Sequence, residues 1–357
     1  MNANIFPLQQ FERKGKTLNV KFGIDPTSDK LHLGHLIPLM IVKELKEEGH
    51  NIDIVLGSFT AMLGDPSEKD TMRPMLSAEQ TKANADSILS QVKRILGEGF
   101  TAHFNHSWFE ELNCVDMIGL LSKFTVKDLL SRDSFQRRID NGNQIGLHEL
   151  VVPILQGIDS AKLKTNIEVG GSDQLFNFTI TREIQKQFEQ EPEVCFMTHI
   201  INGLDGRKMS KSFGNCIFIN DLPINVFGKT MSISDFTMAE WLPVFKVKKE
   251  TCLFETKKKL AFEITKIIWD ENLATEALNH FEKVIQNKEL PENMPETSVK
   301  EILNVISHMN NSSKSDARRL IRQSAVLVNG QKIYDENAIL VPGDIIRAGK
   351  RSFAKIV

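Results

Sequence analysis

The hydrophobic and polar positions along the chain change period several times, and the first changes predict a βαβ unit. Residues 18–24 form an apolar run typical of a buried strand, and turn-forming residues follow it. From Gly34 to Gly49 the apolar positions recur at helical spacing, and residues 51–59 form a second continuous apolar run. A strand, a helix and a strand in this order predict an α/β fold with a parallel sheet.

Most of the segments that follow have the spacing of helices. A Ser-x-x-Gln sequence marks the start of the helix predicted over 77–96. The segment 166–174 predicts a short strand that ends in a Gly-Gly turn. Further helices are predicted over 115–140, over 146–163, from the Gly-Gly turn toward Gln190, and over most of 215–287.

The last part of the chain has the pattern of a separate module. Two prolines and many charged residues make 287–298 a predicted linker. Beyond it, residues 315–324 are predicted to be helical, and Asn329-Gly330 between two short apolar runs predicts a hairpin turn. A small α+β module is therefore expected after the linker.

Composition narrows the class of protein. The 357 residues are enough for two or three domains, and 41% apolar with 25% charged residues is ordinary for a soluble globular protein. No apolar run approaches the roughly 18 residues of a membrane span, and the first residues lack the apolar core of a signal peptide. The four cysteines have no paired spacing, so we expect reduced thiols in a cytoplasmic protein and no zinc site.

Charge is distributed unevenly along the chain, whose net charge is −2. From Thr297 to Val357 there are ten Lys/Arg and five Asp/Glu residues, a net charge of +5, so the other residues carry −7. A basic module is common in proteins that contact nucleic acid, but a solvated basic surface has the same composition.

Two histidines, His32 and His35, flank Gly34 where the first predicted helix begins. Ligands of parallel α/β sheets bind at such loop-to-helix junctions, and a helix N-terminus favours phosphate. The imidazoles could therefore donate to a triphosphate, belong to a metal site, or be incidental to a turn. A metal site needs a third and a fourth ligand, and no Cys or His cluster supplies them.

A second motif, GRKMSKSFGN over 206–215, places Lys208 and Lys211 on a glycine-flanked loop. Taken alone, this segment is either a solvated basic loop or a mobile clamp for a pyrophosphate leaving group. The histidine and lysine motifs are jointly rare by chance, which favours one phosphate site built from both.

Together, the HLGH and KMSKS sequences resemble the two signature motifs of class I aminoacyl-tRNA synthetases. The resemblance narrows to the bacterial tyrosyl-tRNA synthetases and covers nearly the whole chain, including a tail similar to their S4-like RNA-binding domain. The segments that carry it are GIDPTSDKLHLGH, FTAMLGDPS, PILQGIDS, VGGSDQLFN and SDARRLIRQSAVLVNG.

The resemblance implies an order of domains. A Rossmann-like parallel-sheet catalytic domain would occupy 1–220, with a dimerisation insert around 115–150. An α-helical domain that binds the anticodon arm would follow over 221–286, then a linker over 287–296 and a small α+β S4-like domain over 297–357.

The resemblance also implies the activity of a tyrosine–tRNA ligase. The carboxylate of tyrosine would attack the α-phosphate of ATP to give tyrosyl-adenylate and pyrophosphate, and the terminal adenosine of the tRNA would then take the tyrosyl group. Because no covalent enzyme intermediate is formed, catalysis would depend on positioning and charge stabilisation. Mg²⁺ would accompany ATP without a dedicated protein site. The expected partners are tRNA-Tyr, ATP, tyrosine and a second copy of the chain, with neither membrane nor DNA.

The resemblance assigns four sets of residues by position. The catalytic set is His32, His35, Lys208, Lys211 and Thr27. The ATP-binding set is Gly34, Gly171, Asp173, Met209, Ser210 and Ser212. The amino-acid-binding set is Lys21, Gly23, Asp25, Asp65, Gln156, Asp159, Gln174, Val152 and Ile158. The RNA-binding set is Arg318, Arg319, Arg322, Lys350 and Arg351.

The expected amino acid pocket departs from the family pattern at two positions. Val152 and Ile158 stand where the family has tyrosines, whereas Lys21 matches one branch of the family. Either the pocket accepts a different amino acid, or tyrosine is depleted throughout the chain, which has 22 Phe but one Tyr, Tyr334. Asp159, expected to accept the phenolic hydroxyl, favours tyrosine because phenylalanine would leave a buried carboxylate unpaired.

Two other classes of function stay open at this point. One is a catalytically idle RNA-binding paralog, against which the intact HLGH, KMSKS and GGSDQ sequences argue. The other is a synthetase-like ligase for a non-standard amino acid, which the residues Val152 and Ile158 keep open.

Overall fold

The computed structural model describes residues 3–6, 15–63, 77–286, 294–310, 312–349 and 352–357. These residues fall into two compact units, Met1–Asp270 (unit 1) and Glu271–Val357 (unit 2). No helix within the described ranges is both long and apolar enough to cross a membrane.

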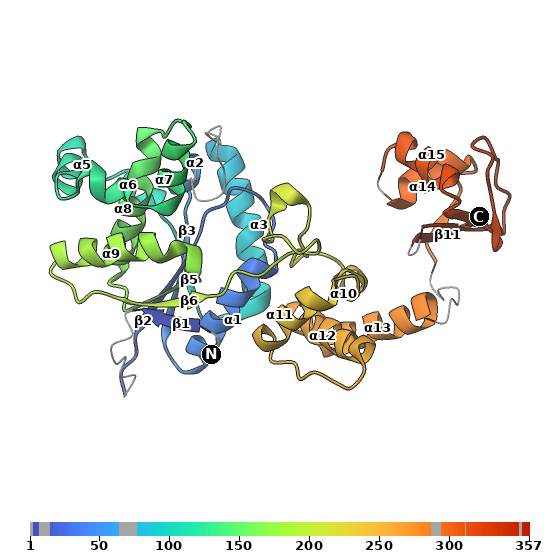
Figure 1. Cartoon of the computed structure of the whole chain (residues 1–357), viewed down its shortest axis with the longest axis horizontal. Helices are drawn as coiled ribbons and strands as arrows, with labels where there is room; N and C mark the ends of the chain where they lie inside the picture. Colours follow the sequence, from blue (N-terminus) through green and yellow to red (C-terminus); the bar gives the residue numbers. More distant parts are fainter. Residues whose placement is uncertain (1–2, 7–14, 64–76, 287–293, 311, 350–351) are drawn as a thin grey trace. The chain divides into compact units, whose positions relative to one another are not determined.

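A mixed, mostly parallel sheet lies at the centre of unit 1 (Figure 1). Within the described residues its six strands have the order β1-β6-β5-β2-β3-β4, and only β1 runs antiparallel to its neighbour. The strands are β1 (Ala3–Phe6), β2 (Asn19–Ile24), β3 (Asn51–Leu56), β4 (Thr101–Phe104), β5 (Ile167–Gly171) and β6 (Val194–Thr198). The expected α/β fold with a parallel sheet is confirmed.

The sequence predicted three of these strands and missed the others. The runs over 18–24, 51–59 and 166–174 correspond to β2, β3 and β5. The missed strands β1, β4 and β6 are four or five residues long. So short a segment has too few positions to show a period, and only β5, which is as short, ends in a Gly-Gly turn that marks it.

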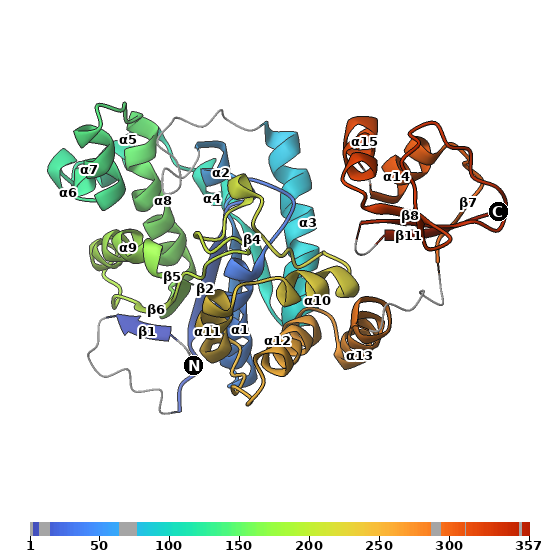
Figure 2. The ribbon, with the colours of Figure 1, turned by 45° about the vertical axis from the view of Figure 1, so that its right-hand side comes forward.

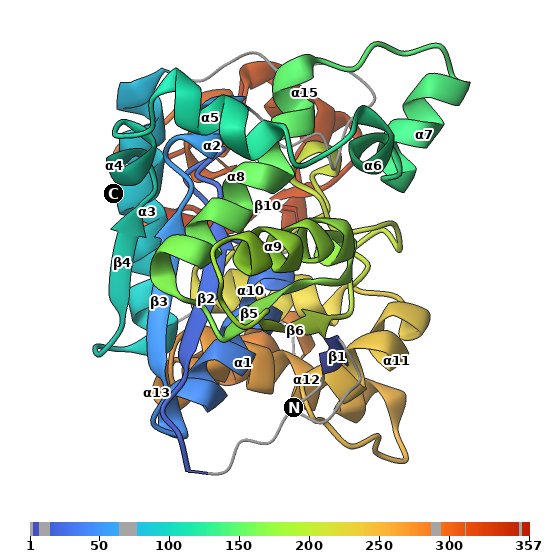
Figure 3. The ribbon, with the colours of Figure 1, turned by 90° about the vertical axis from the view of Figure 1, so that its left-hand side faces the viewer.

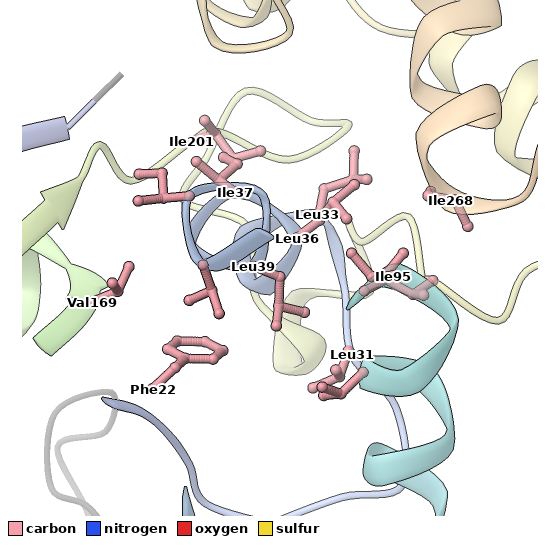
Figure 4. Close-up of a cluster of buried hydrophobic side chains, with 14 of the residues drawn as sticks. Phe22, Leu31, Leu33, Leu36, Ile37, Leu39, Ile95, Val169, Ile201 and Ile268 are labelled. Carbon is pink, nitrogen blue, oxygen red and sulfur yellow. The ribbon is translucent and has the colours of Figure 1, made fainter. Parts of the chain in front are cut away.

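Helix α1 covers one face of the sheet and begins where the sequence predicts it. Its N-cap is His32, and the helix continues to Glu47. Phe22 of β2 points to this face and shares a buried apolar cluster with Leu39 of α1 and Ile95 of α3 (Ala78–Leu96) (Figure 4). Since side chains alternate along a strand, the neighbours of Phe22 point to the opposite face.

Helices α8 and α9 cover that opposite face (Figure 3). The helices of unit 1 are α1 (Leu33–Glu47), α2 (Thr60–Leu63), α3 (Ala78–Leu96), α4 (His106–Phe109), α5 (Cys114–Leu121), α6 (Val126–Leu130), α7 (Asp133–Asp140), α8 (Leu147–Leu163), α9 (Leu175–Gln187), α10 (Pro223–Met231), α11 (Asp235–Val244) and α12 (Leu253–Ile268). The helices predicted over 77–96 and 146–163 are α3 and α8.

The helical pattern over 115–140 is divided into α5, α6 and α7. The side chain of Asn113 accepts hydrogen bonds at the start of α5, and Thr125 forms a reciprocal capping box with Asp128 at the start of α6. These caps interrupt the helix because each satisfies the free N–H groups of a new first turn.

Helices α10, α11 and α12 belong to unit 1. Trp241 of α11 and Ile264 of α12 lie in the same buried cluster as α1, and α12 packs against α3 (Figure 2). The boundary between the units consequently falls at Asp270, inside the 221–286 segment expected as one helical domain.

Unit 2 has its own core around a small sheet. Its described strands have the order β7-β11-β10-β8-β9. Its elements are α13 (Glu271–His280), a π-helical segment (Phe281–Gln286), β7 (Glu296–Thr297), α14 (Ile302–Asn310), α15 (Lys314–Arg322), β8 (Val326–Val328), β9 (Gln331–Lys332), β10 (Ile345–Ala348) and β11 (Ser352–Ile356). Residues 287–293 of the predicted linker lie outside the described residues, and its last residue, Glu296, belongs to β7.

The predicted hairpin turn is confirmed. Asn329 and Gly330 join β8 to β9 with φ angles of 50° and 81°. Two consecutive residues with positive φ match the right-handed twist of the flanking strands, which explains the Asn-Gly sequence.

Candidate active site

A cavity of about 550 Å³ opens where β2, β3, β5 and β6 end and α1 begins. Carboxyl ends of parallel strands beside a helix N-terminus are the usual ligand site of such sheets. Most of the residues assigned from the sequence line this cavity: Lys21, Gly23, Asp25, Thr27, His32, Gly34, His35, Gln156, Asp159, Gly171, Asp173, Gln174, Lys208, Met209, Lys211 and Ser212.

Three assigned residues of unit 1 that the structure describes are not part of this lining. Val152 and Ile158 are buried within α8 and are not among the residues that line the cavity. Ser210 contributes its backbone N–H to the loop itself, as a donor to the side chain of Asn215. Asp65 lies outside the described residues.

His32 and His35 form the N-terminal cap of α1. Nδ1 of His32 accepts from the N–H of Gly34 at 3.1 Å, and Nδ1 of His35 accepts from the N–H of His32 at 3.3 Å. A Cβ on Gly34 would lie 2.9 Å from the His32 ring, so only glycine lets this ring fold back onto the helix end. The two rings meet edge to face with centroids 4.1 Å apart.

Both rings are neutral hydrogen-bond donors. Burial, together with the charges of Lys211 and Lys208, lowers the pKa of His32 to about 3. Burial and the neighbouring His32 hold the pKa of His35 well below its usual value. Because each Nδ1 accepts a backbone hydrogen bond, each ring carries its proton on Nε2. The helix therefore begins with two fixed N–H donors at the wall of the cavity.

The segment 206–215, called the lysine loop below, contributes Lys208 and Lys211 to the cavity lining. Lys208 Nζ lies 3.3 Å from Asp173 Oδ2, and Lys211 Nζ donates to the hydroxyl of Ser28. A Cβ on Gly171 would lie 2.5 Å from Asp173 Oδ1, so glycine makes room for that carboxylate. The loop and the ends of β2 and β5 thus bring both lysines to the histidine side of the cavity.

Asn215 holds the lysine loop, a role that the motif over 206–215 did not predict. Its Oδ1 accepts from the N–H of Ser210 at 2.9 Å, and its Nδ2 donates to Asp205 Oδ1 at 2.7 Å. The hydrogen bonds from Asn215 and Arg207 lower the pKa of Asp205 to about 2. Met209, between the two lysines, is buried in the core of unit 1.

At its other end the cavity is lined by Asp159 of α8. Trp108 Nε1 donates to Asp159 Oδ1 at 2.9 Å, and Asn105 Nδ2 donates to Oδ2 at 3.3 Å. Burial raises the pKa of Asp159 to about 7 against the opposing effects of Lys21 and these two donors. Asn105 and Trp108 follow β4, so the missed strand also concealed these two residues.

Lys21 is the second charged group at this end. Its side chain is buried, lies 2.9 Å from Glu168 Oε1 and donates to the carbonyl of Gln156 at 3.2 Å. The cavity therefore has an anionic and a cationic wall at the end away from the histidines.

The arginines assigned to RNA binding lie on α15 of unit 2 and are engaged by acidic residues. Arg318 and Arg322 both pair with Glu336, at 3.4 and 2.9 Å, and Arg319 pairs with Asp316 at 3.1 Å. These arginines are exposed. The other two assigned residues, Lys350 and Arg351, lie outside the described residues.

Among the described residues, no group of three or more His, Cys, Asp or Glu side chains could hold a metal ion. The two histidines instead have the geometry of donors to an anion.

Comparison with protein families gives two matches that together span most of the chain. A family model described as tRNA synthetases class I (W and Y) matches residues 13–304, and an S4 domain model matches residues 302–346. The tyrosine–tRNA ligase of Thermotoga maritima is 38% identical over 371 residues, which cover 98% of this chain and 92% of that protein. The tyrosine–tRNA ligase of Carboxydothermus hydrogenoformans is 39% identical over 379 residues, with 98% and 92% covered.

Solved structures show the same fold in more distant proteins. A C-terminally truncated mitochondrial tyrosyl-tRNA synthetase of Aspergillus nidulans gives a TM-score of 0.62 at 19% identity, over 75% of this chain and 86% of that chain. The tryptophanyl-tRNA synthetase of Plasmodium falciparum gives 0.55 at 17% identity, over 73% and 77%.

Proposed function

Because the chain belongs to the class I tRNA synthetases (W and Y) and is a tyrosine–tRNA ligase, we propose that the cavity of unit 1 is where it activates tyrosine with ATP. The observation that carries the proposal is the arrangement of the cavity. Neutral N–H donors and two lysines line one end, and a buried carboxylate lines the other.

The phosphate end would receive the triphosphate of ATP. His32 and His35 donate from Nε2 at the N-terminus of α1, where the helix dipole also favours negative charge. Lys208 and Lys211 stabilise the negative charge that develops on the leaving pyrophosphate. Asp173 binds the ribose after Lys208 exchanges its contact with Asp173 for the phosphates.

The reaction is an in-line displacement at phosphorus, in which the enzyme forms no covalent bond to the substrates. A carboxylate oxygen of tyrosine forms a bond to the α-phosphorus, the bond from that phosphorus to the β-phosphate oxygen breaks, and pyrophosphate leaves with the electron pair. In the second step a ribose hydroxyl oxygen of the tRNA forms a bond to the carbonyl carbon of tyrosyl-adenylate, the bond from that carbon to the phosphate oxygen breaks, and AMP leaves with the electron pair while the hydroxyl proton is released. Asp25, Gln156 and Gln174 also line the cavity, where they would hold the amino acid for attack.

Mg²⁺ would arrive with ATP and offset part of the phosphate charge. The lysine and histidine side chains of the cavity fit a magnesium ion that is carried by ATP, since their N–H groups bind phosphate oxygens and not a metal ion.

The two departures from the family pattern are consistent with tyrosine as the substrate. Val152 and Ile158 are fully buried and are not among the cavity-lining residues. Asp159, which does line the cavity, supplies an acceptor that suits a phenolic hydroxyl. The depletion of tyrosine residues throughout the chain then accounts for Val152 and Ile158 without a change of substrate.

We further propose that the enzyme is a cytoplasmic homodimer that binds its tRNA with unit 2 and with the helices over 221–286. Exposed apolar side chains on α5 and at the start of α8 support a protein interface there. The basic face of α15 supports the RNA contact. All four cysteines are free thiols, as suits a reducing compartment.

Amino-acid-dependent exchange between ATP and pyrophosphate tests the assignment of the cavity. The purified enzyme should catalyse exchange with tyrosine, and a Lys208→Ala, Lys211→Ala double variant should lose at least about 100-fold in kcat. Exchange with an amino acid other than tyrosine would mean that the pocket has been retuned.

Charge reversal tests the role of unit 2. With Arg318, Arg319 and Arg322 all changed to Glu, pyrophosphate exchange should be unchanged and the KM for tRNA should rise more than about tenfold. An unchanged KM for tRNA would remove α15 from the RNA-binding surface.

A further inference from the structure

One face of α3 carries a row of polar side chains that hold the segment 26–31, which leads into α1. The row consists of Asn84, Ser87, Gln91 and Arg94. Because these residues are three or four positions apart, they lie on the same side of the helix. Asn84 Nδ2 donates to the carbonyl of Pro26 at 3.0 Å, and Ser87 Oγ donates to the carbonyl of Asp29 at 2.8 Å. The helix therefore holds this segment by its backbone.

Gln91 uses both ends of its carboxamide in this row. Its Oε1 accepts from the N–H of Leu31 at 2.9 Å, and its Nε2 donates to the carbonyl of Asp29 at 2.8 Å. Gln91 is 2% exposed and Leu31 is fully buried, so water does not replace these bonds when the side chain is lost. The two bonds lie between Ser28, which lines the cavity, and His32, the N-cap of α1.

Residues 217–221, the exit segment, follow the lysine loop and are bonded to the histidine motif. His32 and Phe218 form an antiparallel bridge. Next to this bridge, the N–H of Ile219 donates to the carbonyl of Leu31 at 2.8 Å. A shift of the exit segment is therefore passed directly to the backbone of His32.

Arg94 holds the exit segment against the same helix. Its Nη1 donates to the carbonyl of Ile219 at 3.2 Å, and its guanidinium lies over the ring of Trp269, 4.1 Å from the ring centroid. Trp269 Nε1 in turn donates to the carbonyl of Asp221 at 3.0 Å. Stacking on an aromatic ring limits where the planar guanidinium can turn, so its donor stays directed at the exit segment.

These hydrogen bonds form a closed ring that begins and ends on α3. Gln91 bonds Leu31, and Leu31 bonds Ile219. Ile219 bonds Arg94, three positions from Gln91 on the helix. Leu31 and Ile219 are buried and lie outside the strands of the sheet, so these contacts supply the partners that their backbone groups need. The ring thus fixes the distance between the histidine motif and the end of the lysine loop.

We propose that Gln91 and Arg94 are positioning residues of the phosphate end: they hold the histidine motif and the lysine loop at the spacing at which His32 and Lys211 contact the same phosphates. This inference rests on the proposed function of the cavity. Neither Gln91 nor Arg94 is among the residues that line the cavity, so both act through the backbone. Because a misplacement of about 1 Å can cost about 100-fold in rate, a broken ring should slow the step at phosphorus.

Gln91→Leu provides the first test, because it removes the donor and the acceptor and leaves a side chain of similar size. In tyrosine-dependent pyrophosphate exchange, kcat should fall at least about tenfold. The KM for tyrosine should stay within about twofold of normal, because the ring holds the phosphate end of the cavity and not the end with Asp159. A normal kcat in Gln91→Leu would overturn the positioning role.

Gln185→Leu is the matched control. Gln185 of α9 is fully buried and is also bonded at both ends of its carboxamide, to the N–H of Glu193 at 2.7 Å and to the carbonyl of Thr165 at 2.9 Å. These two residues precede β6 and β5, at the end of the sheet opposite the cavity. Gln185→Leu should lose about as much stability as Gln91→Leu and keep a normal kcat. Equal losses of kcat would show a general loosening of the core and overturn the proposal.

Arg94→Met tests the other half of the ring. Arg94 is exposed, so this change removes the donor without opening a cavity in the core. It should lower kcat several-fold, whereas Lys93→Met, which breaks an exposed ion pair with Glu98 one position away, should not. The double variant with Gln91→Leu should be about as slow as the slower single variant, because one ring is broken in all three. Losses that multiply would mean that the two residues do not act as a unit.

Hydrogen exchange tests the ring without reference to activity. In Gln91→Leu, the amides of Leu31 and Ile219 should exchange at least about tenfold faster than in the unaltered protein. In Gln185→Leu they should exchange at the normal rate. Unchanged exchange of both amides in Gln91→Leu would overturn the ring.

The outcomes separate this inference from the proposed function. Failure of the unaltered enzyme to catalyse pyrophosphate exchange with tyrosine would overturn both. Normal activity of the unaltered enzyme, combined with a normal kcat in Gln91→Leu and in Arg94→Met, would overturn the inference alone.

Discussion

At the scale of single residues, the site is built from polar groups that the fold has removed from water. Asp159 is a buried carboxylate whose pKa is raised to about 7, mainly by burial. His32 is a buried imidazole whose pKa is lowered to about 3, also mainly by burial. Burial disfavours the charged form in both cases, so the carboxylate costs stability when ionised and the imidazole stays neutral.

The cost of Asp159 should be visible as a pH dependence of stability. Since its folded pKa is raised, the folded state binds the proton more tightly, and its contribution to the free energy of unfolding decreases as pH rises from about 4 to about 7. In Asp159→Asn this contribution disappears, so between pH 5 and pH 8 the free energy of unfolding of the variant should rise by about 3 kcal/mol relative to that of the unaltered protein.

Urea unfolding of both proteins at pH 5, 6.5 and 8 measures this difference, since all other titrating groups cancel. Asp159→Asn should also lose most of its preference for tyrosine over phenylalanine. Parallel stability curves for the two proteins would show that Asp159 does not titrate in this range.

His32 should matter for catalysis more than for stability. His32→Ala removes an N-cap, which costs about 1 kcal/mol, and also removes a phosphate donor, which should lower kcat about 100-fold. Ser77→Ala removes the cap of α3 away from the cavity and should cost similar stability with unchanged kcat. Similar kcat values for the two variants would refute the donor role of His32.

At the scale of elements, the lysine loop is a short segment held by an isolated β-bridge between Asn202 and Lys208 and, beyond it, by side chains. Asn215 is buried and bonds both Ser210 and Asp205. Met209 anchors the middle of the loop in the core. The loop therefore presents Lys208 and Lys211 on either side of Met209, whose side chain is buried in the core.

Loosening this loop should slow the chemical step. Asn215→Ala should lower kcat for pyrophosphate exchange about tenfold, with the KM for tyrosine nearly unchanged, because the lysines act on the leaving group. Asn19→Ala removes side-chain hydrogen bonds at the opposite end of β2 and serves as the control, with kcat expected to be normal. A kcat within twofold of normal in Asn215→Ala would rule out this positioning role.

At the scale of the whole molecule, unit 1 leaves large apolar side chains exposed on α5, on α6 and at the start of α8. Val115 of α5 and Leu147 at the start of α8 are 80% and 81% exposed, and Ile118 and Val126 are also largely exposed. Clustered exposed apolar residues usually mark an interface. The proposed dimer would cover them.

A charged residue at this surface should produce monomers. Leu147→Asp, combined with Val115→Asp, should halve the mass measured by sedimentation equilibrium, because two buried carboxylates per protomer cannot be paired. Phe236→Asp changes an equally exposed apolar residue on α11 and should leave the mass unchanged. A double variant with the mass of the unaltered protein would place the interface elsewhere.

Local chemistry determined what the sequence could predict. The period of the apolar residues identified β2, β3, α1 and α3, and the Asn329-Gly330 pair identified its turn, because each depends on neighbours in the chain. His32 and Lys208 were found from motifs for the same reason. The short strands β4 and β6 were missed because neighbouring strands stabilise them, and Asn105 and Trp108 were missed with β4.

By itself, the sequence therefore determined the fold class, the family and most of the residues that line the cavity. Only the tertiary structure decided what surrounds them. The register of β2 against β5 placed Glu168 beside Lys21, and packing buried Val152 and Ile158 within α8. Contacts between residues far apart in the chain leave no periodic trace in it, so the charges that buried groups carry become known only when the fold brings them together.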